Sequence, residues 1–243
     1  ASGLGLTGQI PEDLWKLGAN GLYLLDLGDN QLSGQLPSYL GNLTTLVQLN
    51  LDSNSLSGRI PSGVQDLVDL NILSLQKNRF TGPIPVGLSK LTLLSLLQLN
   101  DNQFYSETPG FWGFIDPDRQ PALSVFDISS NSFTGHIDSR VFDLKSITKL
   151  SLGANCLSGP IPLNICSAQN LEVLGLGDMS GGSQCITKIW EGTVFSNIFD
   201  GFVLNHYMEG SIYDCVFTGL PNLKTLVLSG NGFTADLPSE ISS

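Results

Sequence analysis

Residues 46–61 read LVQLNLDSNSLSGRIP, and this stretch decides the fold. Leu49 and Leu51 are two residues apart, so they share one face of a short strand, and the residues between them face the opposite way. Asn54 follows at a turn, where its amide can donate hydrogen bonds to backbone groups and also accept them. Gly58 permits a further bend, and the proline that ends the stretch fixes the chain direction. The stretch therefore predicts a short strand followed by two turns.

The same stretch recurs along the chain with a nearly constant period. Counted on its asparagine, the spacing is 24 residues, except for 29 before Asn131 and 28 before Tyr207. Stacked copies pair their strands in parallel at about 4.8 Å, and their leucines fill a core that no single copy could bury. The repeat positions are Asn30, Asn54, Asn78, Asn102, Asn131, Asn155, Met179, Tyr207 and Asn231.

This periodicity predicts an α/β solenoid of about nine coils with one parallel sheet and few regular helices. We expect one domain over residues 1–243, with regular repeats in 1–178, an irregular repeat flanked by cysteines in 179–220, and a final repeat in 221–243. The nine expected strands are centred on Leu25, Leu49, Leu73, Leu97, Phe126, Leu150, Leu174, Phe202 and Leu226.

The full phrase is Leu-x-x-Leu-x-Leu-x-x-Asn-x-Leu-Ser-Gly-x-Ile-Pro, and it recurs with small changes at 70–85 and 147–162. It resembles the plant-type extracellular leucine-rich repeat of receptor-kinase ectodomains, receptor-like proteins and polygalacturonase-inhibiting proteins. The resemblance implies a concave main sheet, a second short sheet formed by the Ser/Thr-Gly-x-Ile-Pro part, and a role in recognition. Since one scaffold serves many ligands, it does not identify the ligand.

The charge of the chain restricts the class of partner. Eleven Lys and Arg stand against 22 Asp and Glu, which gives a net charge of −11. This disfavours nucleic acid and anionic membranes as partners and permits a basic protein or peptide, or a carbohydrate. No apolar run is long enough to span a bilayer. The chain also starts and stops inside a repeat, so we expect it to be part of a longer chain or assembly.

Polar residues beside the strand leucines are predicted to face outward on the concave sheet. We hypothesise that they receive a basic or hydroxyl-rich ligand, because carboxylates and amides suit peptide backbones and sugars alike. The alternative is that they only solvate an exposed sheet. The candidate residues are Asp26, Asp29, Asn50, Asp52, Gln76, Gln98, Asn100, Asp101 and Asp127.

The 29-residue repeat departs from the pattern, because it loses the Ser/Thr-Gly-x-Ile-Pro phrase and gains aromatic residues. Extra residues in a solenoid usually form a loop at its edge, and exposed aromatic side chains can anchor a partner. The alternative is that these side chains pack over a local gap. The residues are Tyr105, Phe111, Trp112 and Phe114.

Four cysteines, all in the second half, favour disulfides and therefore an extracellular or cell-surface location. They are Cys156, Cys166, Cys185 and Cys215. Three pairings are open; we prefer Cys185 with Cys215, which would close the irregular repeat, and Cys156 with Cys166. Asn42 begins the sequon Asn42-Leu43-Thr44 on the outer side of its coil, so it is a candidate for glycosylation.

The sequence offers no arrangement for catalysis. The two histidines, His136 and His206, lie far apart in the expected stack. Residues 3–8 match Gly-x-Gly-x-x-Gly, but no strand precedes them and Pro11 follows where a dinucleotide fold needs a helix. We therefore expect no enzyme, no cofactor and no metal site. Two function classes stay open: a recognition module (receptor, co-receptor or enzyme inhibitor), and a structural or adhesive component of a wall, matrix or assembly.

Overall fold

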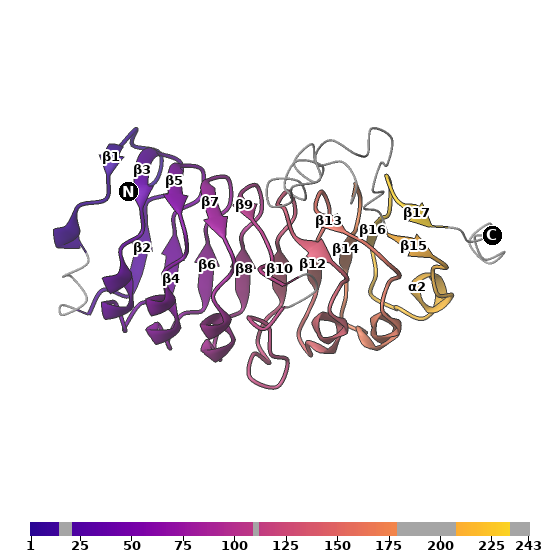
Figure 1. Ribbon diagram of the computed structural model, residues 1–243. Helices are drawn as coiled ribbons and strands as arrows, with labels where there is room; N and C mark the ends of the chain where they lie inside the picture. The colour runs from indigo at the N-terminus through magenta and orange to yellow at the C-terminus, as the bar shows by residue number, and fades with distance from the viewer. Residues whose placement is uncertain (15–20, 109–111, 179–207, 234–243) are drawn as a thin grey trace, which may run out of the picture.

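A computed structural model describes residues 1–14, 21–108, 112–178 and 208–233 of the chain. The described coils stack side by side, and their strands form two sets of parallel strands along the stack (Figure 1). The predicted parallel solenoid with few regular helices is confirmed. No helix in the described ranges combines the length and hydropathy needed to cross a bilayer.

The main sheet takes one short strand from each coil, and every neighbouring pair is parallel. Its register places the central residues of successive strands opposite one another, as in Leu49↔Leu73 and Leu73↔Leu97. The strands are β2 (Leu24–Asp26), β4 (Gln48–Asn50), β6 (Ile72–Ser74), β8 (Leu96–Gln98), β10 (Val125–Asp127), β12 (Lys149–Ser151), β14 (Val173–Gly175) and β16 (Thr225–Val227).

The second set of strands comes from the Ser/Thr-Gly part of the repeat and falls into three pieces. The five-stranded piece contains β1 (Thr7–Gln9), β3 (Gln31–Gln35), β5 (Ser55–Gly58), β7 (Arg79–Gly82) and β9 (Gln103–Phe104). The two-stranded pieces are β11 (Thr134–Gly135) with β13 (Cys156–Leu157), and β15 (Glu209–Gly210) with β17 (Gly232–Phe233). Single bridges, Tyr105↔Ser132 and Gly159↔Met208, join the pieces. The sheet is therefore interrupted where the repeat itself is irregular.

The return segment of most coils is a five-residue 3-10 helix. Proline sets the extended backbone before four of these helices, because its fixed φ suits the residue that precedes a helical turn. Each helix buries an aliphatic or aromatic side chain, such as Leu40, Val64 or Leu88. They are η2 (Ser38–Asn42), η3 (Ser62–Asp66), η4 (Val86–Lys90), η5 (Ser139–Asp143) and η6 (Leu163–Ser167). The α-helix α2 (Cys215–Thr218) takes this place near the end of the stack.

The repeated asparagine links consecutive coils through its side-chain amide. Asn54 donates from Nδ2 to the carbonyl groups of Leu51 (3.2 Å) and Asp52 (2.9 Å) in its own turn, and to Leu27 (2.9 Å) in the preceding coil. Its Oδ1 accepts from the backbone N–H of Leu32, also in the preceding coil, at 2.9 Å. Equivalent bonds occur at Asn78, Asn102, Asn131 and Asn155. The predicted role of this column in satisfying backbone groups is confirmed.

The order of neighbouring strands near the end of the described chain differs from the order that we predicted from the spacing. Leu174 of β14 pairs directly with Leu226 of β16, although 52 residues separate them. Asn231 confirms the adjacency, since its Nδ2 donates to Leu176 (2.6 Å) and its Oδ1 accepts from Met208 (3.4 Å). β14 and β16 are therefore direct neighbours, so the predicted order, in which a strand centred on Phe202 separated them, is wrong; Phe202 itself lies outside the described residues. Residues 208–210 complete the coil that begins with β14, and the main sheet has eight strands in the described chain.

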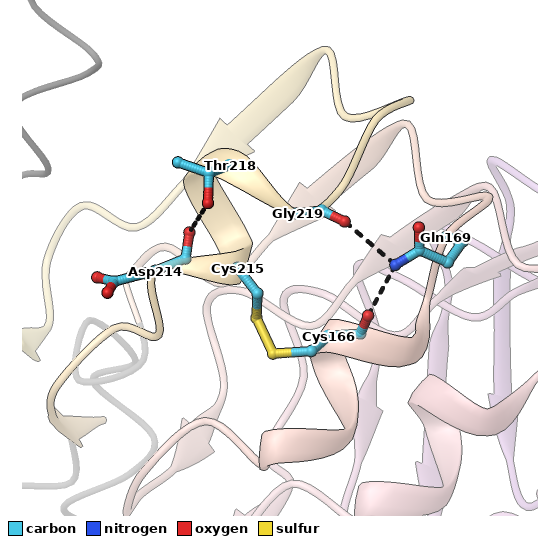
Figure 2. The surroundings of a disulfide bond; sticks show 6 residues. All are labelled: Cys166, Gln169, Asp214, Cys215, Thr218 and Gly219. Carbon is cyan, nitrogen blue, oxygen red and sulfur yellow. Dashed lines mark hydrogen bonds between the residues drawn. A yellow bond between two sulfur atoms is a disulfide. The ribbon is translucent and has the colours of Figure 1, made fainter.

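The predicted disulfide pairing is also wrong. Cys166 of η6 is bonded to Cys215, the first residue of α2, with 5.6 Å between their Cα atoms (Figure 2). Cys156 is disulfide-bonded as well, so it pairs with neither of these residues; Cys185 lies outside the described residues. Gln169 supports the link, because its Nε2 donates to the carbonyl groups of Cys166 (2.8 Å) and Gly219 (3.1 Å). The predicted pairing treats residues 179–220 as a separate coil, and under that interpretation α2 would not lie beside η6.

Replacing Asn155 by alanine should destabilise the fold. This fully buried side chain makes four hydrogen bonds, two of them to backbone groups of the preceding coil at Ile128 and Phe133. Unpartnered buried groups cost about 1–3 kcal/mol each, so we expect a loss of roughly 2–4 kcal/mol in urea unfolding. The exposed Asn170, whose amide reaches only Lys145, is the control. An equal effect of Asn170→Ala would contradict the special role of the column.

Removing the disulfide should weaken the C-terminal coils. The bond closes a loop of 49 residues, for which a chain-entropy estimate gives about 4 kcal/mol. We expect the double variant Cys166→Ala/Cys215→Ala to unfold at lower urea and to be cleaved faster by protease after residue 166. A non-reducing peptide map checks the pairing itself. A peptide joining Cys185 to Cys215 would show that the assignment is incorrect.

Candidate functional site

The face of the main sheet opposite the core is open and carries a column formed by the last residue of each strand. We call it the open face and define it by the strand positions 23–29 and their equivalents in later coils. Because successive side chains alternate, residues on both sides of the core leucine reach this face. The central column runs Asp26, Asn50, Ser74, Gln98, Asp127, Ser151, Gly175 and Val227 in register.

Four carboxylates on the first half of the open face have no ion-pair partner within the described chain. Asp26 and Asp52 are half-buried, whereas Asp29 and Asp101 are exposed at turn positions with φ of 50° and 56°. Positive φ is uncommon for residues with side chains, and aspartate tolerates it better than most. The same positions of the first four coils hold a single cation, Lys77. This half of the open face is therefore acidic.

The amides of the predicted site lie among these carboxylates, and Asn50 links two neighbouring strands. Asn50 donates from Nδ2 to Asp26 Oδ1 (3.1 Å), and its Oδ1 accepts from the backbone N–H of Asp52 (3.2 Å). Asn100 donates to Asp101 Oδ2 at 2.8 Å. The side chains of Gln76 and Gln98 make no hydrogen bond within the described chain and remain available to a ligand. The structure thus brings together the predicted residues of the first four coils.

Two acceptor oxygens on this half have no hydrogen-bond partner although water does not reach them. They are Oδ1 of Asp52 and Oδ1 of Asn100. The Asp52 oxygen lies so close to Gly28 that a Cβ atom on that residue would collide with it unless the carboxylate moved. Buried unpartnered acceptors cost about 1–3 kcal/mol each.

Apolar side chains border the acidic column on one side. Tyr23, Leu24 and Val47 are 67%, 43% and 41% exposed. Ile72 and Leu96 occupy the strand position of Leu24 in the third and fourth coils and are partly exposed. We predicted the polar residues of this face as the site and did not include these apolar residues. The sequence contains a pattern that indicates these apolar residues, because the strand residue directly before the core leucine is aliphatic in three of the first four coils.

Asp127, the remaining predicted residue of this face, has a cationic neighbour, unlike the four carboxylates of the first half. Its side chain is largely covered, accepts from the Ser129 backbone N–H (3.1 Å) and hydroxyl (2.6 Å), and lies 3.6 Å from Lys149 Nζ. Glu172 and Lys224 form a similar pair across coils at 2.8 Å. Most charges of the second half of the open face are therefore neutralised by a neighbouring coil.

The aromatic residues of the 29-residue coil are not exposed anchors where the structure describes them. Trp112 and Phe114 are 1% and 4% exposed, and their rings stack with centroids 6.2 Å apart. Tyr105 is partly buried, and Phe111 lies outside the described residues. The prediction of aromatic anchors is wrong for Trp112 and Phe114, and the alternative of packing over a local gap holds for them. Apolar burial outweighs any benefit of exposing such large rings.

The other predicted features are separate from the open face. His136 contacts the carbonyl oxygen of Ser158 at 3.0 Å through Nδ1, while His206 lies outside the described residues. No group of three or more His, Cys, Asp or Glu side chains suited to a metal ion occurs in the ranges that the structure covers. Asn42 is the last residue of η2 and is exposed, as is Thr44.

Asn42 is an accessible acceptor, so expression in a eukaryotic secretory pathway should add an N-linked glycan there. We expect intact-mass analysis to show a heterogeneous addition that an amidase specific for N-glycans removes, and that Asn42→Gln abolishes. Asn170, which is exposed but has no sequon, serves as the matched site, since Asn170→Gln should change nothing. An unmodified parent chain from secreting cells would contradict the prediction.

A stack of similar coils joined by parallel strands defines the class of solenoid repeat proteins. A model of the leucine-rich repeat matches residues 21–43, 45–67, 69–91 and 222–243. The chain therefore contains leucine-rich repeats, and its structure matches the ectodomains of plant receptor kinases.

Three solved structures illustrate the match. The Arabidopsis receptor kinase HAESA, in complex with the peptide hormone IDA and the co-receptor SERK1, is 29% identical with a TM-score of 0.76, covering 97% of this chain and 34% of HAESA. PEPR1 with AtPEP1 is 28% identical with a TM-score of 0.75, covering 94% and 27%. The plant peptide hormone receptor RGFR1 with RGF2 is 25% identical with a TM-score of 0.72, covering 94% and 35%. The chain spans about a third of the length of these receptors.

Proposed function

We propose that this protein recognises an extracellular peptide or protein segment on the first half of its open face. The segment would lie across strands β2, β4, β6 and β8 and carry basic and aliphatic residues. The observation that carries the proposal is the contrast between the two halves of the sheet. Charges of the second half pair between coils except at Asp178, whereas Asp26, Asp29, Asp52 and Asp101 of the first half all remain without cationic partners in the described chain.

Unpaired carboxylates on a rigid sheet favour a basic ligand for an electrostatic reason. Four acids against Lys77 create a negative potential that attracts a cationic segment and raises its association rate. The strands hold these groups about 4.8 Å apart between coils, so an extended segment can contact several of them. Gln76 and Gln98 add amide groups that can bond to the backbone of the segment.

The apolar residues beside the acids supply a second source of affinity. Burying aliphatic surface contributes about 25 cal/mol per Å², and Tyr23, Leu24 and Val47 are the exposed large hydrophobic residues of the first two coils of this face. Aromatic and aliphatic residues next to charged ones are typical of binding hot spots. A ligand with only basic residues would leave this border uncovered.

The comparisons support peptide recognition in general terms. HAESA, PEPR1 and RGFR1 are receptors solved with peptide ligands. Disulfide bonds persist in oxidising compartments, and the Cys166–Cys215 bond therefore supports an extracellular or cell-surface location. A structural or adhesive role would not require unpaired carboxylates to be concentrated on one half of the sheet.

Selection from a displayed library of random dodecapeptides would test the proposal. We expect the purified protein to enrich peptides rich in Lys or Arg with one or two aliphatic residues. The triple variant Asp26→Asn/Asp52→Asn/Asp101→Asn should bind them about tenfold more weakly, because each exposed ion pair contributes roughly 0.2–1 kcal/mol. Binding to the parent should fall as salt rises from about 50 to about 500 mM.

A control variant with the same net charge as the triple variant separates the effect of the open-face carboxylates from the effect of net charge. The variant Asp66→Asn/Asp69→Asn/Asp118→Asn neutralises three exposed carboxylates away from the open face and should bind like the parent. Selected peptides that bind both triple variants equally would overturn the proposal, as would selection of sequences without basic residues.

A further inference from the structure

A hollow opens on the side of the stack that carries the second set of strands, at the break between β9 and β11. Its volume is about 220 Å³. Ile84, Phe114 and Phe133, which are at most 5% exposed, line it from the core, and Val86 lines it from the surface at 56% exposure. It is separate from the open face of the main sheet, since it uses none of the strand positions 23–29 or their equivalents.

The hollow has a cause in the sequence of the fourth coil. In the regular coils a glycine such as Gly58 (φ 77°) or Gly82 (φ 87°) turns the chain inward, and the following isoleucine, such as Ile60 or Ile84, is buried. Counting from its asparagine, the fourth coil has Ser106 at the glycine position and an exposed Thr108 at the isoleucine position. Ser106 does not adopt positive φ, so this coil makes no such turn.

The packing next to Ile84 therefore lacks one buried aliphatic side chain. Phe114, held against Trp112 by ring stacking at 6.2 Å, fills the inner part of the space. The outer part stays unfilled and opens between Val86, Tyr105 and Glu107. The aromatic residues of this coil thus form the floor of a hollow.

Two polar groups give the hollow a chemical preference. Ser106 lines it, and its hydroxyl is covered and has no hydrogen-bond partner in the described chain. A buried hydroxyl without a partner costs free energy, which a ligand group would recover once rotation of this short side chain turned the hydroxyl toward the hollow. The carboxylate of Glu107, exposed at the mouth, favours a cation beside the entering group.

The size of the hollow identifies what can enter. Pockets for drug-sized ligands usually measure about 300–1,000 Å³, whereas an apolar cavity of roughly 150 Å³ holds a benzene ring. A space of 220 Å³ therefore fits one aromatic side chain and its polar substituent. The proline and phenylalanine side chains that line the walls suit an aromatic ring.

We propose that this hollow is a docking site for a tyrosine side chain of a partner protein, with a Lys or Arg next to that tyrosine in sequence. The ring enters between Val86 and Phe114, its hydroxyl bonds to Ser106, and the neighbouring cation faces Glu107. The site lies apart from the open face, so the protein can hold a peptide and a second protein at the same time. This inference does not depend on the proposed peptide site.

The test uses N-acetyl-Tyr-Lys-amide as the probe and the indole N–H signal of Trp112 as the reporter. Trp112 is suited to this role because it stacks on Phe114, which lines the hollow. We expect saturable shifts with a dissociation constant on the order of 1 mM, as for a single side chain. The Phe-Lys probe should bind about fivefold more weakly to the parent, and the Tyr-Glu probe at least about threefold more weakly.

Three variants make the test specific. Val86→Trp at the exposed mouth should block the hollow and abolish the shifts, while unchanged thermal unfolding shows that it folds. Ser106→Ala should remove the preference for Tyr-Lys over Phe-Lys, and Glu107→Gln the preference for Lys over Glu. Asp26→Asn, on the open face, should bind the probe like the parent, so this test and the test of the peptide site can fail independently.

Several results would overturn the inference. They are an unchanged Trp112 signal at about 10 mM probe, equal shifts in Val86→Trp, and equal affinity for the three probes. Binding that appears only in Phe111→Ala would show that the chain's own aromatic residue occupies the hollow, and the proposal would then be wrong.

Discussion

The hydrogen bonds of the repeated asparagine are the constraint on which the rest of the structure depends. Each Nδ2 satisfies carbonyl groups in its own turn and in the preceding coil, while each Oδ1 accepts from a backbone N–H of that coil. A short turn cannot satisfy these groups by itself, and leaving them unpaired in the core would be costly. The amide therefore fixes the distance and rotation between coils, and the strands and leucines fall into register as a result.

The hydrogen bonds of the repeated asparagine are kept even where the repeat is irregular. Between β14 and β16 extra residues interrupt the repeat, yet Leu174 still pairs with Leu226 and Asn231 still bonds to Leu176. Disulfide bonding of Cys166 to Cys215 holds the convex segments of these coils together. In the fourth coil the asparagine remains but the glycine is lost, so the main sheet continues while the second set of strands is interrupted. The main sheet thus depends on the repeated asparagine, whereas the second set of strands depends on the repeated glycine.

The two proposed binding surfaces follow from these different dependencies. The open face is regular because the asparagine column is regular, and its chemistry varies only through side chains that the core does not need. Asp26 and Asp52 stay uncompensated there, while Asp127 is neutralised by Lys149 from the next coil. By contrast, the hollow beside Ile84 exists because the fourth coil lacks the glycine turn of the regular coils. The two proposed sites therefore lie one on the regular repeats and one at a break in them.

The sequence by itself determined the solenoid, the parallel sheet, the core leucines and the acidic character of the open face. These properties follow from local periodicity, since side-chain alternation and turn chemistry act within a single repeat. It did not determine that Cys166 pairs with Cys215, that residues 208–210 complete the coil of β14, or that Trp112 is buried. Only the tertiary structure decided these points, because they depend on which coils become neighbours. Leu174 and Leu226 are 52 residues apart, which is one period of 24 residues plus 28 more. From the period alone, those 28 residues can be interpreted either as an imperfect coil or as an insertion, because the repeats on either side keep nearly the same register in both cases.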